Sequence, residues 1–561
     1  MAVVESGAKK GSGAGAGARV RLGRRPAQPM TGEALARALL RVALVVFLAA
    51  TVALWLYRAA SLLGDSRVGF DFRPYFAAAL ALRDNPSANI YDPHVLRAAA
   101  LAHGATPPVA IYLYPPLLAV LLLPLTLLPP ATATTAWTLL NLLLEPACIA
   151  LTLSLLARLP VPRVRWRAGN AEIGNAETGA GSTSTSASRD IGLAIYGLAL
   201  ILSLIYDPFI NGIALGQASV AIDFLLLLAP WLALRGHERA AGGVLALAVW
   251  LKLFPLALLV YFALAGRWRI VRAALAVIAA LGLALVPVIG VGGLLATRFV
   301  LSNGGDVSAQ FDNEALRQAP IWIATLFGGG PGSLVSALGY LLIAMVAGAF
   351  TLGMLRVRHA RGASGKDRRQ ALTVTELLGY LWALCTMVLV SPITWMHHYV
   401  WLLPAFMIGG AMALRGPLAA DRRLSALLVI ALALGYLCTF SPLPFTYDGI
   451  GTFDIGPYLL GQPLRPYFML LRPLGTLLLW GATGLLYLAR AAALPSWLRQ
   501  GMTGASAAGE PMLIHTPIVV STRRTAALVL GLLAAVVLAR VVFIAFDLAL
   551  GPGHVVALLA R

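Results

Sequence analysis

The sequence predicts an all-α polytopic membrane protein, and three observations support this fold class. The 561 residues are 59% hydrophobic and only 12% charged, whereas a soluble domain carries about 25% charged residues. The mean hydropathy is +0.82. Basic residues gather at the ends of long apolar segments, as the positive-inside rule requires. The net charge of +20 therefore indicates contact with anionic membrane lipids, not with nucleic acid, for which no motif is present.

The N-terminal segment is predicted to stay on the cytoplasmic side. Residues 1–30 are rich in glycine, alanine and arginine, and we expect them to be disordered. The first apolar segment, residues 38–57, is too long for the core of a cleavable signal peptide. Since arginines precede it, we expect an uncleaved first membrane helix with a cytoplasmic N-terminus.

Apolar segments of about 20 residues, the length that crosses a bilayer, recur along the chain. We expect membrane helices at residues 38–57, 131–157, 190–210, 214–234, 272–294, 333–355, 371–391, 398–414, 425–441, 467–489 and 525–549. With two further apolar segments, the bundle holds about 11–13 helices.

Those two further segments contain interruptions that a straight membrane helix does not tolerate. Residues 109–128 carry several prolines, and residues 240–265 are broken near their middle by Lys252 and Pro255. If neither segment crosses fully, every basic cluster falls on the cytoplasmic side. We therefore predict that 240–265 forms a re-entrant pair of half-helices, which is tolerated where it is buried in protein or lines a cavity.

This topology places the polar and aromatic loops on the extracytoplasmic face, beginning with a large first loop. These loops are residues 64–108, 206–217, 302–320, 391–401 and 441–466. The chain divides into a disordered basic tail, a membrane domain, a flexible cytoplasmic insert, and a final membrane helix with a short tail. Their respective bounds are 1–35, 36–490, 491–524 and 525–561.

Asp71 is the first candidate for chemistry, in the segment "VGFDFRPYF" just after the first membrane helix. A carboxylate surrounded by aromatic side chains is partly desolvated, which makes it a better base. The alternative is an N-cap that begins a helix at the membrane surface. The two roles are compatible.

Three further candidates are basic or titratable. His397 and His398 lie in "SPITWMHHYVW", where imidazole could bind a phosphate or relay a proton; the alternative is an anchor in an interfacial aromatic belt. Lys252, an intramembrane cation, could bind a lipid phosphate, although it could also reach the interface by snorkelling.

The remaining candidates lie in the outer loops or, for Tyr114, in the proline-containing segment 109–128. Arg317 could bind a phosphate through its planar guanidinium, or form a surface salt bridge. The expected substrate-binding residues are Tyr75, Tyr114, Asn211, Gln217, Asn313 and Trp395. Asn211 and Gln217 could equally belong to a simple hairpin. No histidine or cysteine spacing indicates a metal site, and no cofactor is predicted, although the sequence leaves open whether a divalent metal assists.

Four motifs in this order resemble glycosyltransferase family 87, a membrane family of the GT-C superfamily. They are "GFDFRPYFAAALALRDNPSANIYDP", "YLYPPLLAVLLLPLTLLPP", the segment from "GQASVAIDF" to "LKLFPLALL", and "SPITWMHHYVWLLPA", and the resemblance extends over about residues 40–490. It implies a GT-C-type bundle that uses a polyprenyl-phosphate sugar donor and a glycolipid or lipid-linked glycan acceptor.

The same resemblance implies inverting transfer of a hexosyl (mannosyl) or pentosyl residue on the extracytoplasmic face of the plasma membrane. It implies that Asp71 acts as the general base. It also implies that His397 or His398 either interacts with the donor phosphate or takes part in proton transfer.

A lipid or sugar transporter, or flippase, of the cell envelope is the alternative function. Transporters share the many helices and the broken half-helices. The chain, however, shows no clear internal repeat, and its polar residues gather in the outer loops instead of at the midplane. A third possibility is a purely structural membrane partner in envelope assembly, which would tolerate the loss of Asp71.

Overall fold

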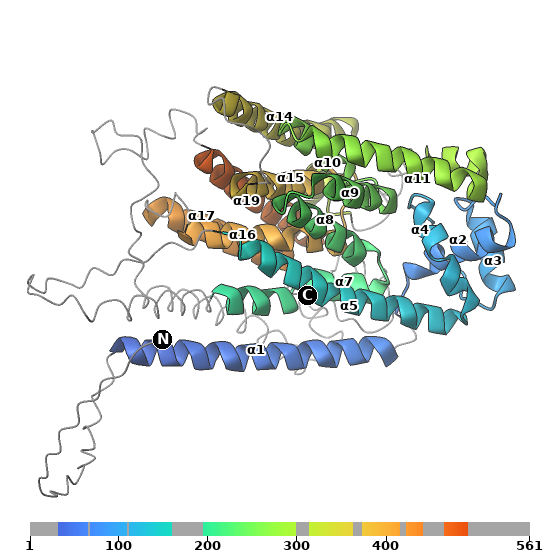
Figure 1. Ribbon diagram of the computed structural model, residues 1–561, viewed down its shortest axis with the longest axis horizontal. Coiled ribbons are helices and arrows are strands. Elements are labelled where there is room, and N and C mark those ends of the chain that lie inside the picture. The colour runs from blue at the N-terminus through green and yellow to red at the C-terminus, as the bar shows by residue number, and fades with distance from the viewer. Residues whose placement is uncertain are drawn as a thin grey trace, which may run out of the picture.

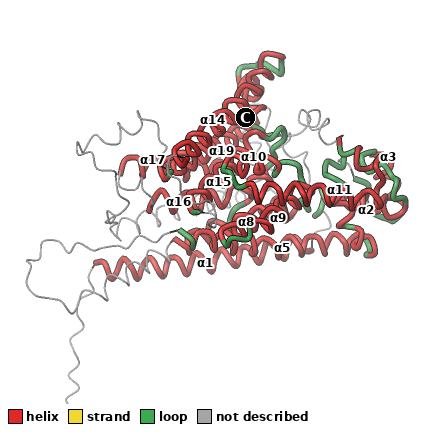
Figure 2. Tube along the Cα trace, turned by 45° about the horizontal axis from the view of Figure 1, so that its top comes forward, coloured by secondary structure: helices red, strands yellow, loops and turns green. Residues whose placement is uncertain are grey.

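The computed structural model describes residues 32–64, 68–108, 111–159, 195–298, 313–362, 373–415, 422–440 and 465–491. Within these ranges the chain is helical and no strand occurs, as Figure 2 shows. The all-α fold class is therefore confirmed. The predicted tail at 1–30, most of the insert at 491–524 and the final helix at 525–549 lie outside the described residues.

Six helices in the described part of the chain are long and apolar enough to cross a membrane. They lie in α1 (Gly32–Gly64), α5 (Pro130–Leu156), the segment Ile195–Leu215 that ends in α7 (Asp207–Leu215), α11 (Trp268–Leu295), α14 (Ser333–Gly362) and α19 (Arg465–Arg490). Shorter helices complete the bundle: α8 (Ser219–Leu234), α15 (Val374–Val390), α16 (Leu403–Arg415) and α17 (Arg422–Phe440). The predicted spans within the described residues are largely helical. The segment 190–210 is interrupted at residues 205–206, and the segment 214–234 at residues 216–218. The protein is a multi-pass membrane protein.

The segment 240–265 forms two short helices instead of one straight span. Helix α9 (Glu238–Leu251) ends at Lys252, whose backbone is extended with φ −156° and ψ 136°. The next residues, Leu253 to Pro255, complete the turn, and α10 (Leu256–Leu264) follows directly. The interruption therefore occurs at the lysine and proline that predicted it.

Both ends of this helix pair lie at the same end of the bundle. Arg267, just after α10, donates from Nη1 to Glu238 Oε1 at the start of α9 over 2.9 Å. It also donates from Nη2 to Glu376 Oε2 at the start of α15 over 2.7 Å. Since one side chain joins the beginning of α9 to the residues after α10, the pair begins and ends at the same end of the bundle, which is the geometry expected of a re-entrant pair. We call this the Arg267 end of the bundle, and the opposite end the Asp71 end.

The described part of 109–128 does not form a membrane helix either. It folds into α4 (Leu117–Leu121) and the short 3-10 helix η1 (Leu123–Leu127), five residues each. Both pack against α2 (Phe72–Asp84), which in turn packs against α3 (Pro93–Ala102). Figure 1 shows α2, α3 and α4 gathered at one end of the long helices. The described parts of the large first loop and of segment 109–128 therefore form a small helical layer at the Asp71 end.

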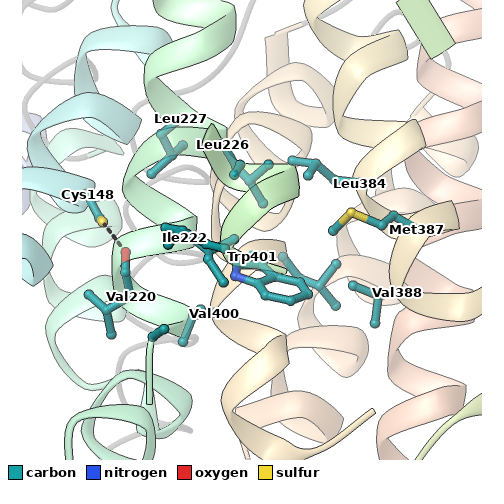
Figure 3. Close-up of a cluster of buried hydrophobic side chains, with 14 of the residues drawn as sticks. Cys148, Val220, Ile222, Leu226, Leu227, Leu384, Met387, Val388, Val400 and Trp401 are labelled. Carbon is teal, nitrogen blue, oxygen red and sulfur yellow. Dashed lines mark hydrogen bonds between the residues drawn. The ribbon is translucent and has the colours of Figure 1, made fainter. Parts of the chain in front are cut away.

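The core of the bundle surrounds Trp401, which lies in η4 (Met396–Leu402) and is 1% exposed. Its indole Nε1 donates to the carbonyl of Ser219 over 3.1 Å. Figure 3 shows its ring among apolar side chains of α8 and α15, including Ile222, Leu226 and Met387. Because η4 is anchored in this way, the histidines beside Trp401 are held in fixed positions.

Candidate active site

The candidate site begins where the chain after α1 packs onto the end of α7. The backbone N–H of Gly69 donates to Ala214 O over 2.9 Å, and that of Asp71 donates to Leu215 O over 2.7 Å. Gly216 follows with φ +71°, and a Cβ there would lie 2.8 Å from the Cβ of Phe72. Only glycine fits this left-handed and crowded position.

Asp71 occupies the N-cap position of α2, but its side chain makes no capping hydrogen bond. Its carboxylate instead accepts a hydrogen bond from Nε2 of Gln217, and the residue is 8% exposed. Burial raises the pKa of Asp71 to about 7, while the hydrogen bond from Gln217 and the charge of Lys252 lower it to a smaller extent. A carboxylate that titrates near neutral pH is suited to act as a general base.

Gln217 connects Asp71 with two tyrosines. Its Oε1 accepts from Tyr75 Oη over 3.0 Å and from Tyr114 Oη over 2.6 Å. Gln217 and both tyrosines are at most 5% exposed. Tyr75 lies in α2 and Tyr114 in the segment before α4, so that three separate parts of the chain meet at one amide.

The tip of the re-entrant pair supplies the cation of the site. Lys252 is 7% exposed, and its Nζ lies 3.3 Å from Tyr114 Oη and 2.5 Å from His398 Nε2. The His398 ring stacks on Trp401 with ring centroids 4.9 Å apart. The structure therefore brings together a set of residues that we call the Asp71–Lys252 network. Its members are Asp71, Gln217, Tyr75, Tyr114, Lys252 and His398.

His397 adjoins this network with a ring centroid 4.4 Å from that of His398. It is 1% exposed, and neither ring nitrogen has a hydrogen-bond partner among the described residues. Nε1 of Trp395 and Oδ1 of Asn211 are likewise buried without a partner in the described part of the chain. Buried polar atoms normally have partners, so these three side chains are candidates for contact with a bound molecule.

Asn313 and Arg317 have contacts with the backbone that precedes the histidines. Asn313 donates from Nδ2 to Pro392 O over 3.0 Å and accepts from Thr394 N over 2.9 Å. Arg317 donates from Nε to Pro392 O over 2.9 Å and from Nη1 to Tyr340 Oη over 3.2 Å. These contacts hold the segment 391–395 in place, and the expected contacts of both residues with substrate stay predictions.

Sequence reasoning missed one buried ion pair near this segment. Glu314 and Arg472 form a salt bridge, with side chains 3% and 4% exposed. Arg472 interrupts the apolar segment 467–489. The rule that singled out Lys252, an ionisable residue within a membrane segment, could have identified Arg472 as well.

Among the described residues, no group of three or more histidine, cysteine, aspartate or glutamate side chains could hold a metal ion. The polar groups of the candidate site are instead amides, hydroxyls, imidazoles, one carboxylate and one ammonium group, which suit the recognition of a sugar and a phosphate.

The comparison with protein families gives the decisive finding. The model of glycosyltransferase family 87 matches residues 112–392. The chain belongs to glycosyltransferase family 87. It is therefore a membrane glycosyltransferase, as the sequence motifs predict. The match is narrower than the expected 40–490: it includes Tyr114, Gln217 and Lys252, whereas Asp71 and the two histidines lie outside it.

One protein similar to this chain is a mannosyltransferase of Mycobacterium tuberculosis (strain ATCC 25618 / H37Rv). The chain is 28% identical to the polyprenol-phosphate-mannose-dependent alpha-(1-2)-phosphatidylinositol mannoside mannosyltransferase over 345 residues, which are 59% of this chain and 68% of the relative. No solved structure matches the chain significantly.

Proposed function

We propose that the protein transfers a mannosyl residue from a polyprenyl-phosphate donor to a glycolipid acceptor, with Asp71 as the general base. The observation that carries this proposal is the buried carboxylate of Asp71 in one hydrogen-bonded network with the Lys252 cation. The donor and the acceptor class follow the printed name of the mycobacterial relative. Family membership supports the transfer reaction itself.

Asp71 accepts the proton of the acceptor hydroxyl as that oxygen attacks the anomeric carbon of the donor sugar. A bond forms between the acceptor oxygen and the anomeric carbon, and the bond from that carbon to the phosphate oxygen breaks. Because the attack comes from the face opposite the leaving phosphate, the anomeric configuration inverts. The proton ends on Asp71, and the electron pair leaves with the polyprenyl phosphate.

Lys252 and His398 are proposed to stabilise the departing phosphate. Both are buried, and the lysine side chain reaches the site from the tip of the re-entrant pair. A fixed charge in a site without water stabilises developing negative charge more strongly than it does in water. His397, Trp395 and Asn211 offer the unpartnered polar atoms that would bind hydroxyls of the sugar or of the acceptor, as far as the described residues go.

The Asp71 end is proposed to face the extracytoplasmic side, because the basic clusters at 235–239 and 266–272 lie at the Arg267 end. Under the positive-inside rule, that end remains in the cytoplasm. A donor anchored in the bilayer by its polyprenyl chain would then meet a lipid-anchored acceptor at one depth. Holding two reactants in this way supplies part of the rate.

The test is sugar transfer in membranes that carry the wild type or the Asp71→Asn variant, with a radiolabelled polyprenyl-phosphate mannose donor. We expect the variant to lose activity about 10²–10⁴-fold, the usual contribution of a general base. The matched control is Asp84→Asn, because Asp84 lies in an exposed ion pair with His103 at the end of the same helix. Full activity of Asp71→Asn at equal abundance would refute the proposed base.

The family match favours sugar transfer over the alternative of a lipid or sugar transporter, although half-helices such as α9 and α10 also occur in transporters. Purified protein in liposomes distinguishes the two functions. Movement of the labelled lipid across the bilayer without formation of a glycosidic bond would support transport.

A further inference from the structure

Gln217 was expected to bind substrate, but its side chain is engaged within the protein. The residue is 4% exposed. Nε2 donates to Asp71, and Oε1 accepts from both Tyr75 and Tyr114. A carbonyl oxygen has two lone pairs, so both acceptor positions of Oε1 are occupied.

The two tyrosines also determine which way the amide points. Tyr114 Oη accepts a hydrogen bond from Lys252 Nζ over 3.3 Å, and it donates its own proton to Gln217 Oε1. A flipped amide would place Oε1 against the carboxylate of Asp71 and lose both hydroxyl donors. The hydrogen bonds therefore run in one direction, from Lys252 through Tyr114 and Gln217 to Asp71, and such chains polarise one another.

We propose that Gln217 is a positioning residue that aims and stabilises the ionised carboxylate of Asp71, with Tyr75 and Tyr114 fixing the orientation of its amide. This inference rests on the proposed role of Asp71 as the base. One carboxylate oxygen is held by Gln217, which leaves the other for the acceptor hydroxyl. The titratable or charged groups that face this arrangement are Tyr75 on α2, Tyr114 before α4 and Lys252 at the tip of the re-entrant pair, with His398 of η4 beyond it.

The test is the Gln217→Glu variant, which has nearly the same shape. Its carboxylate can still accept from Tyr75 and Tyr114, so the fold is expected to persist, but it cannot donate to Asp71 when ionised. Two carboxylates that share a site retain one proton between them. The hydroxyls of Tyr75 and Tyr114 donate to the new carboxylate and favour its ionised form, so the shared proton stays on Asp71. We expect the acidic limb of the kcat/KM profile to move upward by about one pH unit or more, with at least a roughly tenfold loss of kcat at neutral pH and little change in KM.

Tyr75→Phe is the second variant, because it removes one of the two hydroxyls that orient the amide. We expect a smaller shift of the acidic limb in the same direction. An unchanged pH profile for Gln217→Glu, or a raised KM with unchanged kcat, would overturn the inference and return Gln217 to substrate binding. If Asp71→Asn is inactive while Gln217→Glu keeps the wild-type profile, this inference alone fails. If Asp71→Asn is active, the proposed role of Asp71 as the base fails as well.

Discussion

At the scale of single residues, the protonation of Asp71 links burial to activity. Its pKa is raised to about 7 because burial disfavours the charged form. The proposed base must be ionised to accept a proton, so activity is expected to be present above this pH and to be lost as the pH falls through it. The fraction of the enzyme with an ionised Asp71, which is the active fraction, therefore increases with pH.

We predict that kcat/KM falls about tenfold for each pH unit below neutral pH, as expected when a single base must be ionised. The measurement is the initial rate of transfer at low substrate concentration in buffers of matched ionic strength. The Asp84→Asn variant should give the same curve, because Asp84 is exposed and paired with His103. A rate that does not vary across the acidic range would contradict the prediction.

At the scale of elements, the contact between the segment at Gly69 and the end of α7 places Asp71. The two backbone hydrogen bonds there bring the start of α2 against Gly216, and Trp137 Nε1 donates to Gly216 O over 2.8 Å. The Phe72 ring stacks on Trp137 with centroids 5.5 Å apart. The carboxylate is thus positioned by the packing of α2, α5 and α7 as well as by Gln217.

We predict that Gly216→Ala reduces both stability and transfer. A side chain at φ +71° is strained, at a cost of about 1–3 kcal/mol, and the added Cβ would also displace Phe72. The control is Gly104→Ala, at φ +68° with no atom within 4 Å of the added Cβ, which carries the strain without the collision. Melting temperature in detergent and activity should both fall further for Gly216→Ala; equal losses in the two variants would contradict this prediction.

Hydropathy predicted the helices well because a membrane span is a local property of about 20 residues. Lys252 and Asp71 could also be chosen as candidate site residues from the sequence, since each is a charged residue in an apolar or aromatic setting. The hydrogen bond between Asp71 and Gln217 could not be predicted, because the two residues are 146 positions apart and no local pattern relates them. The contacts of Asn313 with the backbone of Pro392 and Thr394 depend on the same kind of long-range packing.

At the scale of the whole molecule, the Asp71–Lys252 network and the ion pairs of Arg267 lie at opposite ends of the re-entrant pair. Arg267 joins Glu238 and Glu376 at one end, whereas Asp71 and Lys252 meet at the other. If the Asp71 end is extracytoplasmic, the loops near the Arg267 end must be cytoplasmic.

We predict opposite accessibility for single cysteines placed at the two ends. Ser87→Cys lies in the exposed turn between α2 and α3, and Arg269→Cys is exposed near Arg267. A maleimide that cannot cross membranes should label Ser87→Cys in intact cells, and Arg269→Cys only after permeabilisation. Cys148 and Cys385 are buried, whereas Cys438 is half-buried, so both variants are made in a Cys438→Ser background. The reverse labelling pattern would show that the Asp71 end is cytoplasmic and would refute the proposed topology.

The network has a consequence for the order of events during synthesis. Asp71 precedes Gln217 by 146 residues, and Lys252 precedes His398 by the same interval. At translation rates of about 5–20 residues per second, Gln217 is synthesised on the order of 10 s after Asp71, and His398 on the order of 10 s after Lys252. The nascent chain therefore holds an incomplete site until η4 has entered the bundle. Quality control that acts on membrane proteins during synthesis would meet the Asp71 loop long before it becomes buried.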